Sequence, residues 1–71
     1  MTDKNAVRGK VIEALPSMNF NVELDDGRKV RAKLSGRMYQ NRIHVGVDDF
    51  VSVVVSPDGI LGRIVRRLLY S

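Results

Sequence analysis

Strict alternation of apolar and polar residues in two neighbouring segments constrains the fold of this chain most. Apolar residues occupy every second position of residues 18–24, and the pattern resumes in residues 28–34 after Asp25-Asp26-Gly27. A period of two is typical of a β-strand with one buried face. Opposite residues of an antiparallel pair share a face, so a three-residue turn, which pairs Val22 with Val30, keeps the apolar side chains together. The segments predict a β-hairpin whose turn ends on a left-handed glycine.

Three more segments have strand character, and one connection does not. Strands are expected over residues 7–15, 48–56 and 62–69, and a short helical connection with Ser35 as its cap over residues 35–42. Five short strands in 71 residues cannot bury a face as an open sheet, so they should close into a barrel. The predicted fold class is all-β, a five-stranded Greek-key barrel of the OB type, as one domain over residues 1–71. A short helix is expected between its third and fourth strands.

The residue types argue against catalysis. The chain has no cysteine and a single histidine, His44, so we expect no nucleophile–base pair, no metal site and no cofactor. The acidic pairs Asp25-Asp26 and Asp48-Asp49 stand next to turns, where solvated aspartates are common. We therefore expect a protein that is not an enzyme.

Charge points to a polyanionic partner. Twelve Lys and Arg against eight Asp and Glu leave a net charge of +4, with an isoelectric point near 10.0. Small basic domains commonly bind nucleic acid, acidic membrane surfaces or acidic proteins, although the charge can serve solubility alone. The longest apolar runs, such as Val53–Val55, are far too short to span a bilayer. We expect a soluble, cytoplasmic monomer with no membrane partner.

A basic stripe lies on the polar face of the second hairpin strand. Lys29, Arg31 and Lys33 should be about 6.6 Å apart along the strand, close to the spacing of successive phosphates. In OB barrels this face and the loops joining strands 1–2 and 4–5 commonly bind nucleic acid. The alternative is a solvated strand face.

Phe20 belongs to the predicted core, so Tyr39 is the candidate for stacking on a base. The pattern favours a protein that recognises shaped RNA.

Several stretches resemble bacterial translation initiation factor 1. They are residues 9–16, residues 20–24 with the following Asp-Gly, residues 32–38 with Asn41 and Ile43, and Ser56-Pro57 ahead of Gly62-Arg63-Ile64. The similarity covers nearly the whole chain in order. Its most specific part runs from Ala32 through Ser35-Gly36-Arg37-Met38, with Asn41 and Ile43 after it.

This resemblance implies an OB barrel that binds the A site of the small ribosomal subunit through rRNA, beside an adjacent ribosomal protein. Such a factor blocks premature tRNA entry and supports initiation factors 2 and 3. Arg37, Met38 and Asn41 would reach into the decoding helix, and Arg63 would contact rRNA. Together with the basic stripe, the expected RNA-binding residues are Lys29, Arg31, Lys33, Ser35, Gly36, Arg37, Met38, Tyr39, Gln40, Asn41, Arg42, His44, Arg63 and Arg66.

The chain departs from the family pattern within this set. Family members usually carry two basic residues where this chain has Tyr39-Gln40, a tyrosine where it has Arg42, and an arginine where it has His44. One hypothesis is that Arg42 supplies the missing phosphate contact while Tyr39 provides a ring. His44 either touches RNA or is an ordinary polar loop residue.

Two alternative functions are compatible with parts of this sequence. A cold-shock-like RNA chaperone also has an OB fold, but that class depends on exposed aromatic clusters that this chain lacks. A protein–protein adaptor could use the apolar tail Leu68-Leu69-Tyr70, which more often packs as the end of a last strand.

Overall fold

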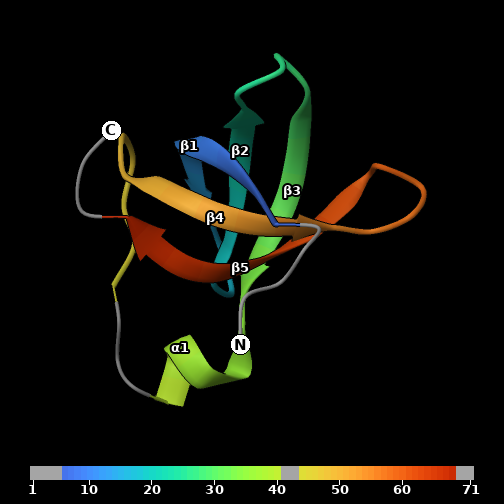
Figure 1. Cartoon of the computed structure of the whole chain (residues 1–71). Coiled ribbons are helices and arrows are strands. Elements are labelled where there is room, and N and C mark those ends of the chain that lie inside the picture. Colours follow the sequence, from blue (N-terminus) through green and yellow to red (C-terminus); the bar gives the residue numbers. More distant parts are fainter. Residues whose placement is uncertain (1–5, 41–43, 69–71) are drawn as a thin grey trace.

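The strands follow one another around a closed barrel in the order β1-β2-β3-β5-β4 (Figure 1). The computed structural model describes residues 6–40 and 44–68, without the side chains of Arg37 and Tyr39. The elements are β1 (Ala6–Leu15), β2 (Asn19–Leu24), β3 (Lys29–Leu34), α1 (Gly36–Gln40), β4 (Phe50–Val55) and β5 (Leu61–Leu68). Neighbouring strands are antiparallel except β3 and β5, which run parallel. This is the five-stranded OB barrel that the sequence predicts.

The β2–β3 hairpin has the predicted register. Val22 lies opposite Val30, and the amide of Gly27 donates to the carbonyl of Leu24 over 2.9 Å. Gly27 has a φ of 92°, which is the left-handed position that the turn requires. The alternation predicts that the strand begins at Met18 with a buried side chain, and this was wrong. Met18 lies in the β1–β2 turn with a φ of 60° and is 47% exposed. The buried alternation of this strand therefore begins at Phe20.

The core is built from the inward-facing positions of all five strands and one helical residue. Val22 of β2 and Ile64 of β5 are fully buried, and burying such side chains stabilises the fold by about 1.5–3 kcal/mol each. The buried apolar residues are Val11, Phe20, Val22, Leu24, Val30, Ala32, Met38, Val51, Val53 and Ile64. Phe20 is thus a core residue, as expected, and every second position of β2 and β3 is left for the outer face, the side of the sheet away from the core.

Two glycines allow strands to approach closely. A Cβ on Gly9 would lie 2.6 Å from Cγ1 of Val22, and a Cβ on Gly62 would lie 2.6 Å from Cγ1 of Val53. Both distances are too short for any other residue without a shift of the neighbouring side chain.

A bulge in β1 changes which residues face outward. Val11 lies opposite Val22 and Glu13 lies opposite Asn21, so Ile12 is the extra residue. A bulge leaves its extra residue unpaired and re-aims the side chains beside it. As a result Glu13 lies on the same outer face as Ile12, which follows the buried Val11 and is 38% exposed.

α1 closes one end of the barrel. The amide of Met38 donates to Oγ of Ser35 over 3.3 Å, which confirms Ser35 as the cap. The amide of Ser35 donates to the carbonyl of Ile64 over 2.9 Å and ties the helix start to β5. The expectation that Met38 reaches outward to RNA is corrected: its side chain is 2% exposed, because the helix turns this apolar residue into the core. Within residues 6–40 and 44–68, no helix is long and apolar enough to cross a membrane.

Candidate RNA interface

The basic stripe lies on the outer face of β3, as predicted. Lys29, Arg31 and Lys33 are all exposed, because the alternate residues of the strand fill the core. The parallel pairing of β3 with β5 places Lys33 directly beside Arg63, at the usual strand spacing of about 4.8 Å. Two predicted RNA contacts from distant parts of the sequence are thus adjacent on one surface.

The basic side chains divide into two groups. Among the residues that the structure describes, the ion pairs are Arg8–Asp25, Lys10–Asp48, Arg28–Asp26 and Arg67–Asp49. Those four cations therefore have acidic partners that offset their charge. Within the same described residues, the cations outside any ion pair are Lys29, Arg31, Lys33, Arg63 and Arg66. All five belong to the set that the sequence predicts to bind RNA.

We call Lys33, Arg63 and Arg66 the cationic end of the outer face. Lys33 has Asn19 on its β2 side, and Arg66 lies opposite Ser52 of β4. These neighbours are uncharged, so no carboxylate adjacent on the described strands reduces the positive potential there. Like charges on neighbouring strands repel one another, and a bound polyanion would remove that repulsion. The cationic end therefore has the electrostatics of a phosphate-binding surface.

The start of β3 differs from the cationic end. Lys29 lies opposite Glu23, and Arg31 lies opposite Asn21. The side-chain amide of Asn21 donates to Oε1 of Glu13 over 2.7 Å. The carboxylates of Glu23 and Glu13 therefore lie one and two strands away from these cations. The electrostatic potential on this half of the stripe has contributions of both signs.

The other predicted site residues lie around α1. Gly36 and Gln40 are exposed at the two ends of the helix, His44 is exposed after it, and Ser35 is half-buried. The helix packs against β5, the strand that carries two members of the cationic end. The predictions for the side chains of Arg37 and Tyr39, and for Asn41 and Arg42, lie outside what the structure describes.

The acidic pairs behave as turn residues. Asp26 accepts from the amide of Arg28 over 3.0 Å and from its Nε over 2.8 Å. These contacts, the backbone hydrogen bond first, hold the pKa of Asp26 below its usual value. Asp49 accepts from the amide of Gly46 over 2.7 Å. Within the described ranges, no group of three His, Cys, Asp or Glu side chains could hold a metal ion.

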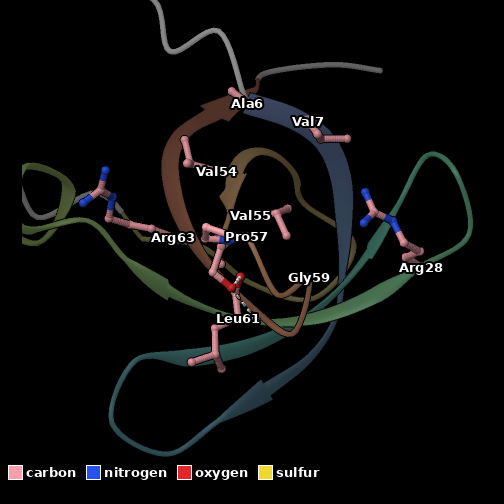
Figure 2. Close-up of a pocket in the computed structure, with 11 residues that line it drawn as sticks. Ala6, Val7, Arg28, Val54, Val55, Pro57, Gly59, Leu61 and Arg63 are labelled. Carbon is pink, nitrogen blue, oxygen red and sulfur yellow. Dashed lines mark hydrogen bonds between the residues drawn. The ribbon is translucent and has the colours of Figure 1, made fainter.

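A hollow at the barrel end opposite α1 was not predicted from the sequence. It has a volume of about 1000 Å³ and is lined largely by apolar residues from the start of β1 and the β4–β5 turn. Figure 2 shows Arg28 and Arg63 on opposite sides of it. Arg28 is held there by Asp26, whereas Arg63 has no partner among the described residues. Arg63 thus belongs to the cationic end and also lines the hollow.

A five-stranded barrel in this order, with a parallel β3–β5 pair and unpaired cations beside that pair, defines a basic domain of the OB class. The family model described as translation initiation factor 1A / IF-1 matches residues 1–71. The chain belongs to this family and is a translation initiation factor.

Solved structures agree with this assignment. The solution structure of translation initiation factor 1 from the Wolbachia endosymbiont of Brugia malayi is 33% identical, with a TM-score of 0.72, and the match covers 92% of this chain and 80% of that one. The crystal structure of YjeQ from Thermotoga maritima is 25% identical, also with a TM-score of 0.72. That match covers 89% of this chain but only 22% of YjeQ, so it concerns one part of a larger protein.

Proposed function

We propose that this initiation factor binds the A site of the small ribosomal subunit through rRNA, blocks premature tRNA entry and supports initiation factors 2 and 3. It acts in the cytoplasm as a monomer, beside an adjacent ribosomal protein and without catalysis. The observation that carries this proposal is the set of five cations without ion-pair partners among the described residues. They gather on β3 and β5, while four other cations are neutralised.

Unpaired cations are better suited to rRNA than paired ones. A phosphate chain releases condensed counterions when unpaired Lys and Arg side chains contact it, and this release gives most of the non-specific affinity. Ion-paired cations contribute less, because binding must first compete with their own carboxylates. Lys33 and Arg63, adjacent on parallel strands, therefore position the factor on rRNA. Specific contacts come from the segment between Ser35 and His44.

Sedimentation tests the proposal. The full chain should pellet with purified small subunits, and raising the salt concentration should release it. It should pellet far less with assembled ribosomes or with random-sequence RNA. Bound factor should also reduce the binding of elongator tRNA to the A site. Equal binding to random RNA would instead favour the general RNA chaperone.

The departures from the family pattern have their own test. If Arg42 supplies a phosphate contact and Tyr39 a stacking ring, Arg42→Ala and Tyr39→Ala should each weaken subunit binding about tenfold, as expected for a stacked base or a charge-assisted contact. Two near-neutral variants would refute this exchange of roles while leaving the A-site proposal intact.

A further inference from the structure

The other half of the basic stripe borders a groove with aliphatic walls. It has a volume of about 430 Å³, within the usual range of roughly 300–1,000 Å³ for ligand pockets. We call it the aliphatic groove, and besides the buried Val30 its lining residues are Ile12, Asn21, Lys29, Arg31, Ile60 and Leu61. It lies on the outer face where β1, β2, β3 and the start of β5 meet, and it shares no residue with the cationic end.

The aliphatic side chains of the groove are unusually exposed for one small area. Ile12 is 38%, Ile60 is 65% and Leu61 is 51% exposed. Single exposed apolar residues are ordinary, but a cluster with a polar rim is typical of an interaction surface. These three side chains would lose contact with water if a partner filled the groove.

The groove is held in shape by backbone structure. The bulge in β1 leaves Ile12 unpaired on the outer face, beside Glu13. The amide of Ile60 donates to Oδ1 of Asp58 over 2.9 Å, and the amide of Ser56 donates to the carbonyl of Leu61 over 2.8 Å. These two hydrogen bonds fix the conformation of the turn that presents Ile60 and Leu61. A preformed surface loses little conformational entropy on binding.

The lining favours protein over RNA. Single-stranded RNA is held by stacking its bases on aromatic rings, and the lining residues include no aromatic side chain. A carboxylate also stands at the edge, since Glu13 accepts a hydrogen bond from the lining residue Asn21. This carboxylate makes the groove less favourable than the cationic end for a phosphate chain, which is charged at every nucleotide. A protein segment can direct its carboxylates to one side and its amides to the other.

We propose that the aliphatic groove docks a protein segment whose aliphatic side chains are flanked by acidic residues. The aliphatic side chains fill the space between Ile12 and Leu61, and the carboxylates meet Lys29 and Arg31. Such an apolar centre with a charged rim is the usual anatomy of a protein interface. This inference goes beyond the proposed function, because it assigns a protein partner to a separate surface, and it can be tested without the ribosome.

The test is an NMR titration of the isotope-labelled full chain with short synthetic peptides. A peptide that alternates glutamate and leucine should shift the amide signals around the aliphatic groove saturably, at millimolar concentrations or below. Peptides with serine in place of leucine, or lysine in place of glutamate, should not. No saturable shift with the first peptide, or equal shifts with the serine peptide, would overturn the proposal. So would an oligouridylate that shifts these amides in preference to the peptide.

Two variants and a matched control locate the binding. Ile60→Ser should weaken the acidic peptide about fivefold or more, since it removes apolar area from the contact, and Arg31→Gln should weaken it similarly. Val47→Ser is the control, because Val47 is 53% exposed but lies outside the groove. Equal affinity in Ile60→Ser and Val47→Ser would place the peptide elsewhere and overturn the proposal. Sedimentation with small subunits should not change in Ile60→Ser, which separates this test from that of the proposed function.

Discussion

The cationic end and the aliphatic groove lie side by side on one outer face, yet their chemistry differs. At the cationic end, Lys33 and Arg63 are adjacent and their other neighbours on the sheet are uncharged. In the aliphatic groove, Lys29 and Arg31 stand among carboxylates and exposed isoleucines. The basic stripe of β3 therefore serves two surfaces. A run of alternate cations does not define a single site until the strands on either side of it are known.

Reversing charge at the cationic end should have the largest effect. The double variant Lys33→Glu with Arg63→Glu should weaken binding to small subunits about 100-fold or more, roughly 2.8 kcal/mol, because phosphate contacts become repulsions. Both side chains are exposed, so the fold should persist, which circular dichroism would check. Binding of the glutamate–leucine peptide should not change. A loss of both activities would mean that the two surfaces are not separate.

Gly62 connects the two surfaces, because it lies between Leu61 of the groove and Arg63 of the cationic end. Gly62→Ala should lower the free energy of unfolding by about 1–3 kcal/mol, since the new methyl would lie 2.6 Å from Cγ1 of Val53. Denaturant unfolding measures this. Gly36→Ala is the control, because a Cβ there meets no atom within 4 Å, and it should be neutral or stabilising by up to about 1 kcal/mol. Similar losses in both variants would refute the crowding at Gly62.

The salt dependence of subunit binding should distinguish a lysine outside the ion pairs from one inside them. Lys33→Ala should reduce the slope of log affinity for small subunits against log salt by about 1, as one phosphate contact is lost. Lys10→Ala is matched in charge, but Lys10 pairs with Asp48 at 3.4 Å, so its slope should stay near that of the parent. Sedimentation over a salt series gives both slopes. Equal slopes for the two variants would contradict the division into paired and unpaired cations.

Acid should have the smallest effect, and it should act on the groove through Asp58 of the β4–β5 turn. Hydrogen bonds from the Ser56 hydroxyl and the Ile60 amide hold the pKa of Asp58 below 3.8. A lowered folded-state pKa stabilises the fold above about 3.8 and loses that contribution as pH falls through the folded value. The protection factors of the backbone amides of the β4–β5 turn, which correct for the intrinsic pH dependence of hydrogen exchange, should therefore be lower at pH 2 than at pH 5. Asp58→Asn should reduce this difference, and an unchanged pH dependence would show that Asp58 does not hold the turn.

Local patterns in the sequence predicted the local structure well. The alternation of β2 and β3 was enough for the register of Val22 with Val30, and Ser35 marked the start of α1. These features depend on neighbours in the chain. The parallel pairing that joins Lys33 to Arg63 spans thirty positions, so no local pattern in the sequence predicted it.

The misses have physical causes. The pattern of residues 7–15 does not reveal the bulge that places Glu13 beside Ile12 on the outer face, because a bulge depends on the pairing with β2. Met38 was predicted to contact RNA, but the single turn of α1 directs its apolar side chain into the barrel core, where burial is favoured. The division of cations into paired and unpaired groups also depends on folded geometry. Asp48, for example, reaches Lys10 from a distant loop.

Directed hydroxyl-radical probing tests the central claim, that the cationic end faces rRNA, most directly. The chain has no native cysteine, so an iron chelate can be attached to single-cysteine variants. Asn19→Cys places it opposite Lys33, and Ile60→Cys places it in the aliphatic groove. On small subunits, cleavage of rRNA at the decoding site should be strong from position 19 and weak from position 60. No decoding-site cleavage from position 19, or equal cleavage from both positions, would contradict the account.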